Sequence, residues 1–124
     1  MKSIEIPETI TSISTLSFAN TENLVYVKLP DKLTSMGSYT FYCTIMTSIT
    51  LPSIVTTVHD STFEGSTSLT TITLLGNVDT IKSNAFKNSP KLRIINYYGK
   101  TNTTYSSNCF TDTNNIEKSL CYGR

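Results

Sequence analysis

The feature that most constrains this chain is the near-constant spacing of its five phenylalanines. They occur at Phe18, Phe41, Phe63, Phe86 and Phe110, so the intervals are 23, 22, 23 and 24 residues. A period of about 20–50 residues is typical of proteins built from stacked structural units. The sequence therefore predicts a solenoid, in which each unit buries apolar side chains against the next unit.

Other apolar residues recur at fixed distances from each phenylalanine. An aliphatic residue follows each phenylalanine after six residues, or after five in the unit of Phe41, and two further apolar positions come three and five residues later. These alternating positions predict the inward side of a strand. They are Leu24, Val27 and Leu29; Met46, Ile49 and Leu51; Leu69, Ile72 and Leu74; and Leu92, Ile95 and Tyr97, with Ile4 and Ile6 in the first unit.

The end of each predicted strand and the return segment also repeat. Proline follows the strand at Pro7, Pro30 and Pro52, where the missing backbone donor is expected to end strand pairing. The segments 37–40 and 82–85 are expected to form at most one turn of 3₁₀ or α-helix. A second apolar pair lies between proline and phenylalanine, at Ile10 and Ile13, Leu33 and Met36, Val55 and Val58, and Val78 and Ile81.

The period divides residues 1–124 into a single array of about four to five units. The predicted boundaries are 1–23, 24–45, 46–68, 69–91 and 92–124. In the last unit Tyr105 fills the column five residues before Phe110, and only Ser119 and Cys121 remain to form the next strand, so 105–124 is interpreted as a degenerate cap. No cap is apparent at the start, which suggests self-association through the apolar edge of Ile4, Ile6, Ile10 and Ile13.

Composition and charge argue against several classes of function. Hydroxyl residues dominate, with 22 Thr and 16 Ser, whereas charged residues make up only 15%. A net charge of +1 without a basic cluster argues against nucleic-acid binding. No apolar run approaches the roughly 20 residues of a membrane helix, and the N-terminus lacks the apolar core of a signal peptide. The chain is thus expected to be either cytoplasmic or, as we favour, an excerpt of a longer protein.

The reactive side chains suggest no catalytic or metal centre. Three cysteines cannot all pair within the chain, and none forms a C-x-x-C motif. Cys109 occupies a column of small residues, which favours a buried thiol, and a Cys109–Cys121 disulfide is the alternative. His59, beside Asp60 and Glu64, is interpreted as a residue of a surface turn. We expect no cofactor, no metal and no enzymatic activity, and Asn102 is a weak glycosylation acceptor.

The repeat unit resembles a known family. The unit Leu-x-x-Ile-x-Leu-Pro-x-x-Val-x-x-Val-x-x-x-x-Phe, read here from Met46 to Phe63, is similar to the BspA-like (Treponema pallidum type) leucine-rich repeat. The resemblance covers Ile4 to about Ile116, although Leu75 and Tyr98 stand where earlier units have proline. It implies a β-rich (α/β-type), right-handed superhelical solenoid, with a parallel sheet on its concave side and short strands or 3₁₀ turns on its convex side.

The resemblance also implies a setting. Members of this family are surface proteins of bacteria and mucosal protists that adhere to host matrix, host cells or other microbes, and they share no catalytic motif. The Ser-, Thr-, Asn- and Tyr-rich composition is similar to that of protist members. A cell-surface or secreted location follows from the resemblance, whereas a cytoplasmic location is the alternative.

The candidate binding surface consists of the strand positions that point away from the core. Neighbouring rungs of a sheet lie about 4.8 Å apart, so a partner can contact several at once, and an exposed Tyr26 is suited to anchor it. We predict a non-enzymatic interaction or adhesion module that binds a protein or glycan. The alternatives are a solvated threonine ladder and an intracellular scaffold without a ligand. The predicted site residues are Tyr26, Lys28, Ser48, Thr50, Thr71, Thr73, Ile94 and Asn96.

Overall fold

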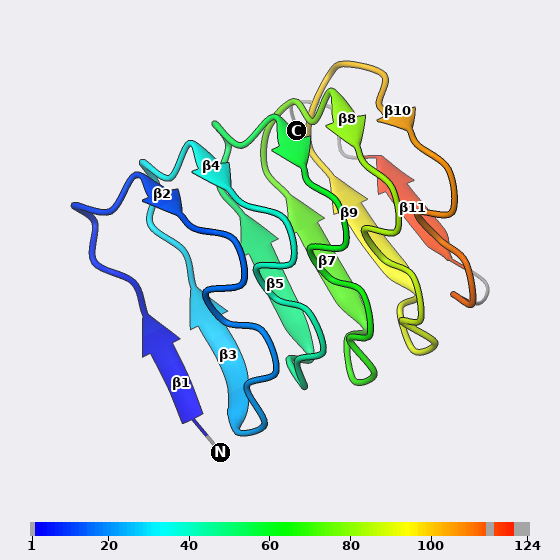
Figure 1. Ribbon diagram of the computed structural model, residues 1–124. Coiled ribbons are helices and arrows are strands. Elements are labelled where there is room, and N and C mark those ends of the chain that lie inside the picture. Colours follow the sequence, from blue (N-terminus) through cyan, green and yellow to red (C-terminus); the bar gives the residue numbers. More distant parts are fainter. Residues whose placement is uncertain (1, 114–115, 121–124) are drawn as a thin grey trace.

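The computed structural model describes residues 2–113 and 116–120, and over these residues the chain is a parallel-strand β-solenoid of about 5 turns. Figure 1 shows one row of long strands beside a second row of short strands, joined by turns. The predicted repeat architecture is confirmed. No helix occurs among the described residues, and the segments 37–40 and 82–85 form turns.

Each unit contributes one long and one short strand, and every strand pairs in parallel with a neighbour (Figure 1). The long strands are β1 (Lys2–Glu5), β3 (Leu24–Lys28), β5 (Ser48–Leu51), β7 (Thr71–Leu74), β9 (Ile94–Tyr97) and β11 (Glu117–Leu120). The short strands are β2 (Ser12–Ile13), β4 (Ser35–Met36), β6 (Thr57–Val58), β8 (Thr80–Ile81) and β10 (Thr104–Tyr105).

The core lies between the two rows of strands and consists of the predicted columns. Ile49 and Leu51 of β5 are buried, as are their counterparts in β7 and β9. The first unit is the exception, because Ile4 and Ile10 are each 38% exposed although their columns are buried elsewhere. The physical reason is that, within the described residues, this unit packs against a neighbouring unit on one side.

The five phenylalanine rings form a continuous stack. Successive ring centroids lie 5.4–5.6 Å apart, and successive ring planes are inclined by only 2–8°. Backbone hydrogen bonds join the same turns, since the N–H of Phe41 donates to the carbonyl of Thr62 (2.9 Å) and that of Phe63 to Ala85 (2.8 Å). The turns therefore form a third ladder, between the long and the short strands.

These turns depend on a backbone feature that the sequence analysis did not identify. The residues two before and two after each phenylalanine have positive φ, a region that L-residues other than Asn, Asp and Gly seldom adopt. The residues before it are Leu16, Tyr39, Ser61, Asn84 and Asn108, and those after it are Asn20, Cys43, Gly65, Asn88 and Asp112. The recurrence of Asn, Asp and Gly in these columns is the sequence feature that could have predicted positive φ here.

A column of hydroxyl residues lies three positions after each phenylalanine. Ser89 Oγ donates to the Phe63 carbonyl (3.1 Å), and Thr113 Oγ1 donates to the Phe86 carbonyl (2.6 Å), so each hydroxyl ties its unit to the preceding one. Thr44 and Ser66 occupy the same column and are buried, but their hydroxyls have no hydrogen-bond partner among the described residues. Both lie in the units on either side of the 22-residue interval.

The shortened interval coincides with a break in both rows of strands. β1 pairs with β3, and β5, β7, β9 and β11 form one sheet in that order, but β3 and β5 form no hydrogen-bonded ladder; β4 and β6 likewise do not pair. Backbone hydrogen bonds of the phenylalanine turns bridge the break, through Tyr39 N–H to the Asp60 carbonyl (3.0 Å) and Cys43 N–H to the Glu64 carbonyl (2.9 Å). One missing residue therefore disrupts strand pairing while the phenylalanine stack continues.

The register of the last strand corrects one prediction. The sequence count assigned Ser119 and Cys121 to the inward strand positions of the final unit. In the structure Lys118 is the partner of Ile95 and Leu120 the partner of Tyr97, which shifts the strand by one residue. Cys121 lies outside the described residues, and Tyr105 pairs with Ile81 as its column predicted.

No helix within the described ranges has the length and apolar character that crossing a membrane requires.

Candidate functional site

The outward side chains of β3, β5, β7 and β9 form what we call the ladder face. Ser48, Thr71 and Ile94 are direct partners across the sheet and make one column. Thr50, Thr73 and Asn96 make the second column, and β3 extends the face with Tyr26 and Lys28. Because the long strands are in register, side chains from separate units lie side by side in two straight rows.

The eight predicted site residues differ in accessibility. Tyr26 is 46% exposed and Ile94 40%, so the face carries one large apolar side chain near each end. Lys28 and Thr50 are also exposed, whereas Ser48, Thr71, Thr73 and Asn96 are half-buried. The exposed residues cluster where β3 lies beside β5, and again at β9.

A cleft of about 230 Å³ lies on the ladder face at the break between β3 and β5. Three predicted site residues line it, namely Tyr26, Lys28 and Thr50, together with Asp31 and Leu75 from the adjoining turns. The sequence analysis did not predict this cleft. The sequence feature that could have predicted it is the 22-residue interval, which marks the place where neighbouring units cannot share a common register.

The proline of the third unit contributes to the break. Leu75 N–H donates to the Leu51 carbonyl (3.2 Å), and Tyr98 N–H donates to the Leu74 carbonyl (2.9 Å), so each closes the end of a strand pair. Pro52 occupies the same column and has no N–H to donate to Leu29. Leu75 and Tyr98, which stand where earlier units have proline, thus each make a backbone hydrogen bond that Pro52 cannot make.

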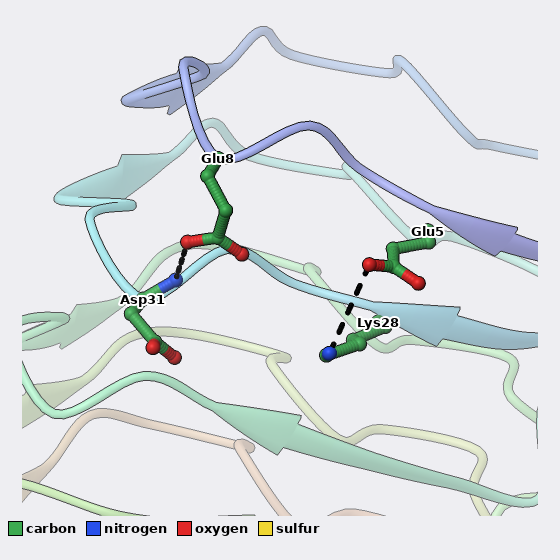
Figure 2. A network of polar contacts seen from close by, with 4 residues as sticks. All are labelled: Glu5, Glu8, Lys28 and Asp31. Carbon is green, nitrogen blue, oxygen red and sulfur yellow. Dashed lines mark hydrogen bonds and ion pairs between the residues drawn. The ribbon is translucent and has the colours of Figure 1, made fainter.

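Acidic side chains of the first unit contact two of the residues that line the cleft (Figure 2). Lys28 Nζ lies 3.8 Å from Glu5 Oε2, and both side chains are more than half exposed. Glu8 Oε1 accepts a hydrogen bond from the Asp31 N–H (3.2 Å). In Figure 2 the Asp31 carboxylate points away from Glu8, and it has no partner among the described residues. The ion pair neutralises Lys28, so the surroundings of the cleft are acidic.

The histidine considered in the sequence analysis lies in a turn. His59 is half-buried, its carbonyl accepts a hydrogen bond from Thr62 Oγ1 (2.9 Å), and Asp60 Oδ1 accepts one from the Ser83 N–H (3.1 Å). Asp60 thereby joins two turns of the solenoid. Within the described residues no group of three or more His, Cys, Asp or Glu side chains could hold a metal ion.

The remaining predicted positions lie away from the ladder face. Cys109 is buried, and its proposed partner Cys121 lies outside the described residues. Asn102 is exposed in the loop between β9 and β10. On the turns, a hydrogen bond with Cys43 raises the pKa of Tyr42, and the nearby charges of Cys43 and Glu64 raise it further.

The stacked parallel strands, the repeated apolar columns and the outward rows of side chains define the class of leucine-rich-repeat solenoids. The chain belongs to the BspA type leucine rich repeat region family, whose model of 6 copies matches residues 1–117. No curated protein and no solved structure shows significant similarity to the chain. Proteins of this repeat family are typically non-enzymatic interaction modules.

Proposed function

We propose that this chain is a non-enzymatic adhesion module that binds a protein or glycan partner through the ladder face. The observation that carries the proposal is the register of β5, β7 and β9, which aligns exposed and half-exposed side chains of three units into two rows. A partner that lies across both rows makes contacts with several units simultaneously. Tyr26 and Ile94 supply the large apolar side chains that anchor such contacts.

The likeness to BspA type repeats supports a location at the cell surface or in the medium, with a host matrix, host cell or other microbe as the setting. The second candidate is an intracellular scaffold without a ligand of its own, which the half-buried threonines of the ladder face favour. Export distinguishes the two candidates. Fractionation of the source cells with an antibody to this chain should find an adhesion module at the surface or in the medium.

The direct test is a binding screen of the purified chain against matrix proteins, cells and glycans. A variant carrying Tyr26→Ser, Lys28→Gln, Thr50→Lys and Thr73→Glu should abolish any interaction found. A control variant with Ile54→Ser, Thr67→Lys and Lys91→Gln changes exposed residues on the turns and should bind normally. Both variants should retain the far-UV circular dichroism of the parent. Retained binding by the first variant would contradict the assignment to the ladder face.

We also propose that the first unit associates with a second copy of the chain. Ile4 and Ile10 are each 38% exposed, although their columns are covered by a neighbouring unit elsewhere in the solenoid, and Leu16 of the same unit is 54% exposed. The outer edge of β1 can accept a further strand. Light scattering should show a mass that rises with concentration and falls back in the variant Ile4→Lys, Ile10→Glu. A parent that stays monomeric at high concentration would contradict this association.

A further inference from the structure

We infer that the cleft between β3 and β5 binds a single uncharged sugar residue of a glycan. This inference rests on the proposed function, because the cleft is part of the ladder face, and it adds the chemical class of the ligand. The size of the cleft, its backbone groups, its side chains and its charge all favour such a ligand.

The size of the cleft admits one small group and no more. Its volume is about 230 Å³, below the range of about 300–1,000 Å³ of sites for drug-sized ligands. A folded segment of a protein partner does not fit between β3 and β5. A ring with its substituents does, because at roughly 30 Å³ per water the space equals some seven or eight waters.

Backbone groups that would be bonded in a continuous sheet face this cleft. Ile6 N–H donates to the Lys28 carbonyl (3.0 Å), so the backbone of Lys28 faces β1 and, by alternation, that of Leu29 faces β5. Leu75 N–H donates to the Leu51 carbonyl, so the backbone of Thr50 faces β3 by the same alternation. Because the two strands form no ladder, these groups are available as donors and acceptors to a ligand.

The side chains of the cleft combine both types of polar group with apolar surface. Asp31 offers a carboxylate that only accepts, and Thr50 a hydroxyl that both donates and accepts. Tyr26 and Leu75 are 46% and 43% exposed and present apolar area beside these groups. A sugar ring matches this arrangement, because its hydroxyls both donate and accept while its C–H face packs on apolar and aromatic side chains.

The charges select against ionic ligands. Lys28, the one cation lining the cleft, lies 3.8 Å from Glu5, and Glu8 lies beside Asp31 (Figure 2). A carboxylated or sulfated sugar would therefore meet the Asp31 carboxylate in the cleft, with Glu5 and Glu8 on the adjoining unit. The ring hydroxyls of a neutral sugar can accept from Lys28 and donate to Asp31, without leaving a buried charge unpaired.

The experiment is an NMR titration of the ¹⁵N-labelled chain with methyl glycosides of glucose, galactose, mannose and N-acetylglucosamine. At least one should give saturable shifts, with a dissociation constant in the millimolar range, at the amides of Val27–Asp31 and Thr50–Leu51. Methyl glucuronide and glucosamine provide the anionic and cationic comparison and should bind more weakly.

Substitutions locate the site. Thr50→Val removes the hydroxyl without changing the shape and should weaken binding about three- to tenfold. Thr67→Val is the matched control, because Thr67 is an exposed turn residue outside both the ladder face and the cleft, and it should change affinity less than twofold. Asp31→Asn and Tyr26→Ala should each weaken binding about three- to tenfold.

Four results would overturn the inference: no saturable shift with any neutral glycoside, shifts centred on β7 and β9, tighter binding of a charged probe, or equal losses for Thr50→Val and Thr67→Val. The sugar-site proposal and the adhesion proposal can be refuted independently of each other. If the fourfold ladder-face variant abolishes partner binding while sugars leave the cleft unshifted, the adhesion proposal stands and the sugar site falls. If sugars bind in the cleft but that variant retains its partner, the sugar site stands and the adhesion proposal falls.

Discussion

The rings of Phe63 and Phe86, which are 23 residues apart in the chain, lie parallel with centroids 5.4 Å apart and planes inclined by 2°. Each ring is fully buried and is covered on both faces by rings of neighbouring units. The stack is therefore the structure through which every unit is coupled to the next. It is also the structure that continues across the break between β3 and β5.

Removal of a central ring should have a large effect on stability. Phe63→Ala leaves a cavity between Phe41 and Phe86 and is expected to lower the free energy of unfolding by about 3–5 kcal/mol. Phe18→Ala is the comparison, because Phe18 is only partly buried and has one stacked neighbour, so its loss should cost clearly less. Urea unfolding followed by far-UV circular dichroism measures both variants. Equal losses of unfolding free energy would contradict the inference that stacking on two neighbouring rings stabilises Phe63 more than stacking on one stabilises Phe18.

The positive-φ columns predict a stabilising substitution. Leu16 has φ 65° and is 54% exposed, so it adopts a conformation that disfavours a branched side chain while burying little surface. Leu16→Asn should therefore raise the free energy of unfolding by about 0.5–1 kcal/mol. Asn84→Ala, at the equivalent position with φ 60°, should lower it by about 1 kcal/mol.

The control for this pair is Thr9→Asn, an exposed turn residue outside the positive-φ columns, which should change stability by less than about 0.5 kcal/mol. Thermal unfolding of the four proteins side by side is sufficient. A destabilised Leu16→Asn would show that the contacts of the leucine outweigh the backbone effect.

The hydroxyl column predicts opposite outcomes for two serines in equivalent positions. Ser89→Ala removes the hydrogen bond to the buried Phe63 carbonyl and should cost about 1–2 kcal/mol. Ser66→Ala removes a buried hydroxyl that has no partner among the described residues, so it should be neutral or slightly stabilising. Denaturant midpoints distinguish these outcomes, and a loss at Ser66 as large as that at Ser89 would mean that Ser66 is hydrogen-bonded in solution.

Hydrogen exchange should reveal the break between β3 and β5. The amides of Val27 and Leu29 face the break, whereas those of Ile72 and Leu74, in the same columns, face β9 and are paired. All four side chains are buried, so burial does not separate them. Val27 and Leu29 should exchange about tenfold faster or more, the factor expected for one hydrogen bond of about 1.4 kcal/mol. Equal protection would mean that β3 and β5 pair in solution.

The repeat made much of the fold and part of the site predictable. The solenoid, the buried columns and the phenylalanine stack followed from side-chain spacing, because a buried apolar residue must recur wherever a unit meets its neighbour. The two rows of the ladder face followed from strand alternation, so Thr50 and Thr73 could be aligned from the sequence alone. Their role in binding is a proposal.

Other features depend on three-dimensional relationships that spacing does not encode. The residue spacing showed that one residue is missing between Phe41 and Met46. It did not show that the phenylalanine stack would continue past this deletion while both rows of strands lose their pairing. Likewise, Leu16, Tyr39 and Cys43 adopt positive φ because the neighbouring turns require it, not because of any preference of their own.

The sequence by itself determined which residues are buried and how many units stack, since both depend on a period that can be counted. Tertiary structure alone decided which backbone groups find partners: it set the register of β11 against β9 and left β3 and β5 unpaired. The physical reason is that burial is a property of each side chain, whereas a backbone hydrogen bond requires two strands to match in both position and direction.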